Sequence, residues 1–71
     1  MAMVYGNLAS VKKKNNDLKN ALIDLSFAVR LKPDYYIAFN NRGSINFEMK
    51  DYKDAVADFD QVITTFQSTI N

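Results

Sequence analysis

The chain has 71 residues, enough for one small domain with a modest core. It contains no cysteine and no histidine, which excludes disulfides and the usual zinc sites. Nine lysines and arginines against eight aspartates and glutamates give a net charge of +1, which argues against bulk attraction to nucleic acid or to an acidic membrane. No apolar run approaches the roughly 18 residues of a membrane span, and the order of charge at the N-terminus is not that of a secretory signal. We therefore expect a cytoplasmic protein.

The first two predicted helices form one hairpin. A helix is expected over about residues 3–14, and a break follows at Asn15–Asp17, where Asn tolerates a left-handed backbone and Asp17 can cap the next helix. The second helix is expected over about residues 18–31, because the residue before Pro33 is disfavoured in a helix. Apolar residues recur at spacings of three and four, as in amphipathic helices. They are Tyr5, Leu8, Ala9 and Val11 in the first helix, and Leu18, Ala21, Leu22, Leu25, Ala28 and Val29 in the second.

The rest of the chain predicts a second hairpin, because the sequence repeats itself under the shift that carries Asp17 onto Asp51. Asp17–Val29 reads DLKNALIDLSFAV, and Asp51–Ile63 reads DYKDAVADFDQVI. A third helix is expected over about residues 35–49, capped by Asp34, and a fourth over about residues 52–66, capped by Asp51. The identical pairs are Asn7/Asn41, Ser10/Ser44, Asp17/Asp51, Lys19/Lys53, Ala21/Ala55 and Asp24/Asp58.

Small residues also recur under this shift. Ala9 corresponds to Gly43 in mid-helix, where glycine costs about 1 kcal/mol relative to alanine. We interpret them as points at which the helices of each hairpin cross closely, with Leu25 and Phe59 filling the space one turn on. The alternative is that the small residues are incidental.

A helix–turn–helix unit that repeats after about 34 residues is typical of one family. The chain resembles the tetratricopeptide repeat over nearly its whole length. The resemblance implies an all-α fold in which two antiparallel helical hairpins, residues 1–34 and 35–68, stack as a short right-handed α-solenoid, with residues 69–71 as a tail. The matching residues are Tyr5, Leu8, Ala9, Ala21, Leu25, Ala28 and Pro33 in the first unit, and Phe39, Gly43, Tyr52, Ala55 and Phe59 in the second.

The chain departs from the family pattern at several positions. Lys12 and Asn46 stand where the family has a second aromatic residue, and Arg42 stands where it has a large apolar one. Asn16 and Lys50 replace the glycine expected between the helices, so that a merged third and fourth helix is conceivable. These changes are typical of a divergent or end-of-array pair of repeats.

The resemblance further implies a concave groove, lined by the first helix of each unit, that binds a peptide or protein segment. Phe47 is the candidate anchor, because an exposed aromatic among polar neighbours is typical of binding hot spots; core packing is an equal alternative. One subfamily clamps the C-terminal carboxylates of heat-shock chaperones, but only Asn41 matches its five positions, so that clamp is not expected. The implied groove residues are Met3, Gly6, Ser10, Lys13, Lys14, Ile37, Asn40, Asn41, Ser44, Phe47 and Glu48.

The last helix suggests self-association. Stacked repeats bury their faces only against neighbours, so Phe59, Val62, Ile63 and Phe66 are expected to be half covered by their own hairpin. Residues 1–34 carry six basic and three acidic side chains and residues 35–71 carry three and five, which favours head-to-tail stacking or helix exchange between copies unless the gradient arose by chance. An assembly scaffold with no dedicated peptide ligand is therefore the alternative to a peptide-binding module.

Other chemistry is less favoured. The run Lys12–Lys14 ends a helix, where cations complement the helix dipole, and a phosphate or nucleic-acid contact is the weaker interpretation. Asp51, Asp54 and Asp58 share one helix face and are interpreted as solvated surface rather than as an acid–base pair. With no histidine, cysteine or phosphate-binding glycine loop, we expect no enzyme, metal or cofactor.

Overall fold

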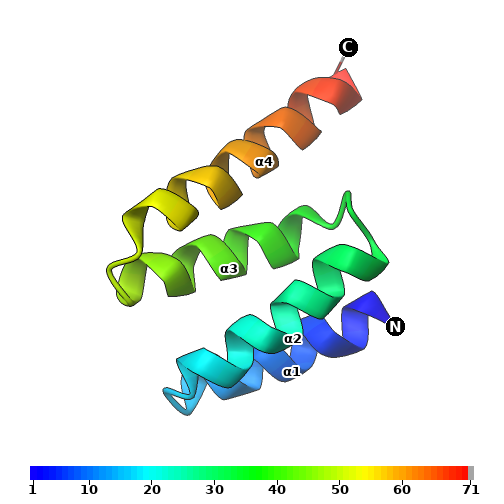
Figure 1. Cartoon of the computed structure of the whole chain (residues 1–71). Helices are drawn as coiled ribbons and strands as arrows, with labels where there is room; N and C mark the ends of the chain where they lie inside the picture. Colours follow the sequence, from blue (N-terminus) through cyan, green and yellow to red (C-terminus); the bar gives the residue numbers. More distant parts are fainter. Residues whose placement is uncertain (71) are drawn as a thin grey trace.

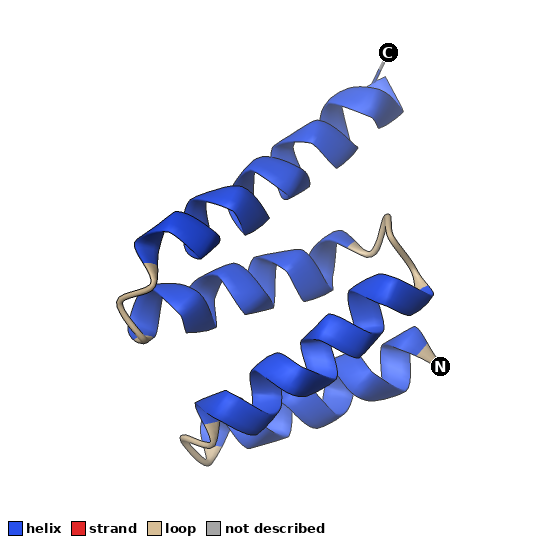
Figure 2. Ribbon diagram, viewed as in Figure 1, coloured by secondary structure: helices blue, strands red, loops and turns tan. Residues whose placement is uncertain are grey.

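The structure, a computed structural model, describes residues 1–70, with side chains described through residue 67. It contains four helices: α1 (Ala2–Lys14), α2 (Leu18–Leu31), α3 (Tyr36–Glu48) and α4 (Tyr52–Ile70). Figure 2 shows no strand among the described residues, so the predicted all-α fold is confirmed. Helix α4 is longer than predicted and includes residues 69 and 70 of the expected tail, whereas residue 71 lies outside the described residues.

The helices pack as two hairpins stacked in one direction. Helix α1 packs along α2, and α3 packs along α4. The hairpins meet mainly where α3 lies on α2, and α1 contacts α3 to a smaller extent. Figure 1 shows α3 between α2 and α4, with the α1–α2 hairpin at one end of the stack and α4 at the other. Each end of the stack therefore has a helix that is covered on one side only.

Both hairpin turns use a residue in the left-handed conformation. Asn16 has φ 62° and Lys50 has φ 65°, at the two positions where the family has glycine. Each turn is closed by a backbone hydrogen bond to the end of the preceding helix. Asp17 N–H donates to the Lys12 carbonyl at 2.8 Å, and Asp51 N–H donates to the Asn46 carbonyl at 2.8 Å. This is the Schellman arrangement, which ends a helix by bonding its last free carbonyls. Lys50 accepts the strained conformation, so α3 and α4 remain separate helices.

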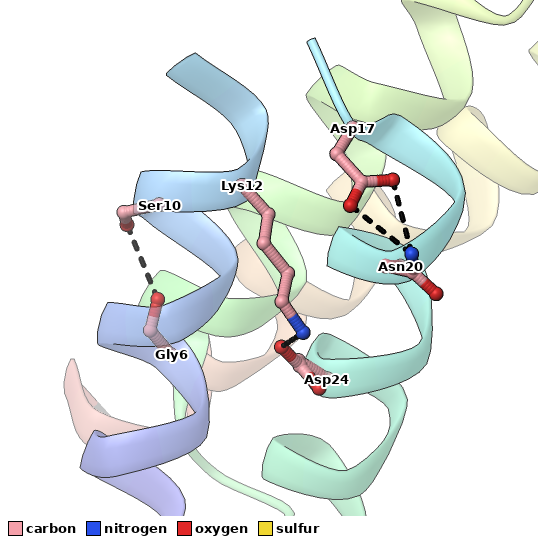
Figure 3. A network of polar contacts seen from close by, with 6 residues as sticks. All are labelled: Gly6, Ser10, Lys12, Asp17, Asn20 and Asp24. Carbon is pink, nitrogen blue, oxygen red and sulfur yellow. Dashed lines mark hydrogen bonds and ion pairs between the residues drawn. The ribbon is translucent and has the colours of Figure 1, made fainter. Parts of the chain in front are cut away.

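The predicted caps of α2 and α3 are not formed by side chains. Asp17 is the N-cap residue of α2, but its carboxylate accepts two hydrogen bonds from the Asn20 amide, at 3.0 and 3.2 Å, and none from the helix backbone (Figure 3). The prediction for Asp34 is wrong, because Tyr35 is the N-cap residue of α3 and Asp34 pairs on the surface with Lys32.

The core lies where the two hairpins meet. Leu25 and Ile45 are the largest side chains that are completely buried. Leu8 and Val11 belong to the predicted apolar side of α1, but they are 45% and 59% exposed and lie outside the core. The buried cluster consists of Ala9, Ala21, Leu25, Ala28, Ala38 and Ile45.

The predicted close crossing is confirmed at Gly43. A Cβ atom added to this residue would lie 2.8 Å from Cε1 of Phe59, closer than carbon atoms can approach. In the first hairpin the corresponding residues are Ala9 and Leu25, both buried in one cluster. The smaller leucine leaves room for a methyl group, whereas the ring of Phe59 requires glycine.

The size match between these pairs gives a prediction. Gly43→Ala should destabilise the chain, because overpacking costs about 1–3 kcal/mol and exceeds the gain of about 1 kcal/mol in helix propensity. Adding Phe59→Leu to Gly43→Ala copies the first hairpin and should recover most of the loss. Urea unfolding followed by circular dichroism measures both variants. A double variant less stable than Gly43→Ala alone would contradict the size-matching argument.

Candidate protein-binding groove

A pocket of ≈ 340 Å³ lies between α1 and α3. Its floor is apolar and consists of Ala9, Leu25 and Ile45, one residue from each of the three helices that meet there. Its rim is polar and consists of Ser10, Lys13, Lys14, Asn41 and Glu48. An apolar floor with a few convergent polar groups is the usual composition of a binding site.

Helix α1 supplies one wall of the pocket. Ser10, Lys13 and Lys14 share a face because they are three and four residues apart. The Ser10 hydroxyl donates to the Gly6 carbonyl at 3.2 Å, which orients the side chain along its own helix (Figure 3). Lys13 is half-buried and Lys14 is exposed, and within the described residues neither forms an ion pair. Two ammonium groups therefore face one side of the pocket.

Helix α3 supplies the opposite wall through Asn41 and Glu48. Asn41 is half-buried, so its amide can donate and accept at the pocket entrance. Glu48 is exposed at the end of the helix and is the one acidic residue of the rim. The charge around the pocket is therefore positive on the α1 wall and negative at one end of the α3 wall.

The other residues of the predicted groove lie outside this pocket. Gly6 is buried rather than open to a ligand, because Tyr35 packs on it with its hydroxyl oxygen 3.0 Å from where a Cβ atom would lie. Phe47 is 59% exposed, which makes core packing the wrong interpretation, and its ring meets Tyr52 edge-on at 5.4 Å between centroids. The remainder, all exposed or half-buried, are Met3, Ile37, Asn40 and Ser44.

A buried carboxylate occupies the same position in each hairpin. Asp24 is 7% exposed and accepts a 2.6 Å ion pair from Lys12 (Figure 3). Asp58 is 5% exposed and accepts from Arg42 at 2.7 and 3.0 Å and from Asn46 at 3.1 Å. The prediction of a solvated Asp58 is therefore wrong. The departures from the family pattern on α1 and α3 supply the donors for these carboxylates.

Both halves of this arrangement are visible in the sequence. Asp24 and Asp58 recur as an identical pair, and Lys12 and Asn46 recur as polar replacements of an aromatic residue. Because each replacement lies across the hairpin from its carboxylate, the two patterns together could have predicted the pairs. The run Lys12–Lys14 ends α1, as expected. Lys12 forms the ion pair with Asp24, whereas Lys13 and Lys14 line the pocket.

Arg42 connects three helices. Besides its two bonds to Asp58 of α4, its guanidinium makes a long contact of 3.5 Å with the Ser26 hydroxyl of α2. It also lies 5.5 Å from the centroid of the Phe39 ring on its own helix. A planar cation with several donors suits such a position better than the apolar residue of the family pattern.

Two of the three acidic residues on the face of α4 remain at the surface. Asp51 and Asp54 are exposed, in line with the prediction. The pKa of the Asp54 carboxyl is raised above its ordinary value, first by hydrogen bonding to the Asp51 side chain and then by repulsion from its charge. Asp54 also lines a second pocket, of ≈ 370 Å³, together with Asp58, whose carboxylate is already paired with Arg42 and Asn46.

The outer side of α4 is apolar and only partly covered. Tyr52, Val56 and Ile63 are each more than half exposed, at 53%, 59% and 55%. Of the predicted self-association residues, Phe59 and Val62 are half-buried, whereas Phe66 is 47% exposed and packs its ring on Tyr36 at 4.9 Å. We call Tyr52, Val56, Ile63 and Phe66 the α4 outer face.

None of the helices formed by the described residues is both long and apolar enough to cross a membrane. Nor does this part of the chain contain three or more acidic side chains placed to hold a metal ion together.

Comparison with known proteins identifies the fold family. The model of the tetratricopeptide repeat matches residues 2–35 and again residues 36–67. The chain belongs to the tetratricopeptide repeat family. A TPR repeat-containing protein of Rhizobium etli is similar to it, with 35% identity over 63 residues. The alignment covers 89% of this chain and 29% of that relative, so the chain spans less than a third of the relative's length. Tetratricopeptide repeats generally mediate protein–protein interaction and are generally non-catalytic.

Proposed function

We propose that this tetratricopeptide repeat chain binds an extended segment of another protein in the groove between α1 and α3, without catalysis. The observation that supports this most directly is the pocket of ≈ 340 Å³ with an apolar floor and a polar rim. The chain's net charge of +1 favours a protein over a nucleic acid as the partner.

The chemistry of the pocket indicates which segment it would accept. The floor of Ala9, Leu25 and Ile45 is at most 1% exposed, so an apolar side chain would rest chiefly against the aliphatic stems of Lys13 and Lys14 above it. Lys13 and Lys14 suit a carboxylate beside it, since hydrogen bonds to charged groups are worth about 1.5–3 kcal/mol. The Asn41 amide can pair with the peptide backbone. We therefore propose an acidic residue next to an apolar residue as the recognised feature.

A peptide array provides the test. The array holds peptides of about twelve residues that differ in the positions of their acidic and apolar residues. Peptides in which an acidic residue is adjacent to an apolar one should bind the chain, and the others should not. Lys13→Glu should then weaken binding of the selected peptides about tenfold, which corresponds to about 1.4 kcal/mol. Lys19→Glu is the matched control, because Lys19 is exposed on α2 and does not line the pocket.

Two results would contradict the proposal. Equal weakening by Lys19→Glu would show that binding responds to net charge rather than to the groove. Binding that is unchanged in both Lys13→Glu and Asn41→Ala would place the peptide elsewhere on the chain. Phe47→Ala tests whether the peptide also contacts the chain outside the pocket. It should weaken binding only if the peptide extends beyond the pocket to the end of α3.

The α4 outer face supports a second function, assembly into a scaffold of several chains. Three of its four large side chains are more than half exposed, and apolar surface of this kind is commonly covered by a partner. We propose that copies of the chain associate through this face. This function and groove binding are compatible, since the α4 outer face and the α1–α3 pocket share no residue.

A further inference from the structure

The contact between α2 and α3 shows how the first hairpin of this chain packs against the second. Ala38 and Ile45 of α3 are completely buried and belong to the same cluster as Leu25 of α2. On the α2 side, Leu22 and Val29 are half-buried and pack against this cluster. The α2–α3 contact therefore consists of a row of apolar residues on each helix.

The same two rows occur again, uncovered, at the two ends of the chain. The shift that relates the two repeats pairs Ala38 and Ile45 with Val4 and Val11 of α1, which are 53% and 59% exposed. The same shift pairs Leu22 and Val29 with Val56 and Ile63 of α4, which are 59% and 55% exposed. One end thus repeats the α3 half of the contact, and the other end repeats the α2 half.

Charge favours joining these two ends over joining two identical ends. On helix α1, Lys12 is already paired with Asp24, which leaves Lys13 and Lys14 and no acidic residue. On helix α4, Asp58 is already paired with Arg42, which leaves Asp54 and Asp60 against Lys53. Two α4 helices facing each other would oppose like charges, whereas α4 facing α1 would oppose unlike ones. The partner that fits both the apolar row and the charge of α4 is the α1 end of a second copy.

We propose that α4 of one copy packs against α1 of the next, in the register in which α2 packs against α3. This rests on the proposed self-association and specifies its geometry. The contact is head-to-tail, so each added copy again exposes an α4 outer face and growth does not stop at a dimer. The α4 end of one copy meets the α1 end of the next, so the stacking of successive hairpins continues from one chain into the next.

The register also predicts a second groove at each junction. The residues of the α1–α3 pocket have counterparts in the other repeat, so a new pocket would form between α3 of one copy and α1 of the next. Ser44, Phe47 and Glu48 would form one wall, in the places that Ser10, Lys13 and Lys14 have in the single chain. Phe47, which lies outside the pocket of the single chain, would then line a groove.

A mixing experiment tests the geometry with two variants. Val11→Asp blocks the α1 end and Ile63→Asp blocks the α4 end, and both side chains are more than half exposed, so the fold should be kept. The unaltered chain should show a weight-average mass that rises with concentration in sedimentation equilibrium. Each variant alone should stay at the 8.1 kDa of one chain, and an equimolar mixture should form a species of about twice that mass. Circular dichroism verifies that both variants are folded.

The controls and the contrary results separate the geometry from self-association itself. Thr64→Asp adds the same charge beside Ile63 and should leave the mass of the assembly unchanged. An unaltered chain that remains at the mass of one chain overturns both self-association and the proposed register. If Val11→Asp still forms dimers, or if the mixture of the two variants stays at one chain, self-association stands but the α4–α1 register is overturned.

Discussion

Replacing Arg42 with methionine should lower the free energy of unfolding by about 3 kcal/mol. Removing one partner of a buried ion pair typically costs about 3–5 kcal/mol, because the other charge is left uncompensated. The Asp58 side chain is only 7% exposed, but Asn46 still donates to it, so we expect the lower end of this range. Urea unfolding of the chain and of Arg42→Met, followed by circular dichroism, measures the difference.

A surface pair provides the comparison. Lys32 and Asp34 lie 3.5 Å apart with side chains 57% and 74% exposed, and exposed pairs contribute about 0–1 kcal/mol. Lys32→Met should therefore have almost no effect. If Arg42→Met were no more destabilising than Lys32→Met, the pairing of Arg42 with Asp58 would not be a significant part of the chain's stability.

Leu25→Ala should destabilise the chain by about 2–5 kcal/mol, the range for removing a buried leucine side chain. Leu25 is 0% exposed and is covered by its own hairpin and by α3, so the cavity cannot easily collapse. A chain of 71 residues has a total stability of only about 4–10 kcal/mol, so the variant should be partly unfolded at 37 °C. Thermal unfolding monitored by circular dichroism measures the loss.

Ile23→Ala is the matched control for this substitution. Ile23 lies on the same helix but is 50% exposed, so its truncation removes little buried surface and leaves no closed cavity. It should cost well under half as much as Leu25→Ala. Equal losses for the two variants would mean that the burial of Leu25 between the hairpins is not what determines the stability of α2.

The helices and their pairing could be predicted because the information is local. Apolar spacings of three and four, the break at Asn15–Asp17 and Pro33 each act within one or two turns of chain. The repeat added the pairing, since a unit seen twice must bury its apolar stripe in the same way twice. Gly43 and Phe59 followed from that, because a small residue on one helix and a large one on the other must correspond.

The errors arose where the outcome depends on which neighbour is present. Val11 and Ile45 are equivalent in the pattern, yet one is 59% exposed and the other 0%, because only the second has a hairpin in front of it. Asp58 looks solvated in a helical projection that counts its own helix alone. Its burial depends on Arg42 and Asn46 across the hairpin. The cap at Asp34 failed because α3 begins after Tyr35 instead.

Part of the candidate groove could be predicted from the sequence, because the spacing of residues along a helix determines which of them share a face. Ser10, Lys13 and Lys14 lie on one face of α1 by spacing alone, and Asn41 and Glu48 meet them because α3 stacks beside α1. The burial of Gly6 could not be predicted, because Tyr35, which covers it, comes from the loop between the hairpins. A periodic pattern gives the orientation of a residue on its helix, but it does not indicate which loop side chain will pack over it.

Helix α4 packs on α3 alone within the described part of the chain, and this one-sided support affects how the molecule can unfold. Detaching α4 breaks one helix–helix contact and leaves α1, α2 and α3 packed around Leu25. In stacked repeats such partial opening requires less free energy than global unfolding, and it occurs reversibly under native conditions. The backbone amides of α4 would then exchange with solvent through a low-energy open state, while those around Leu25 would exchange only when the whole chain unfolds.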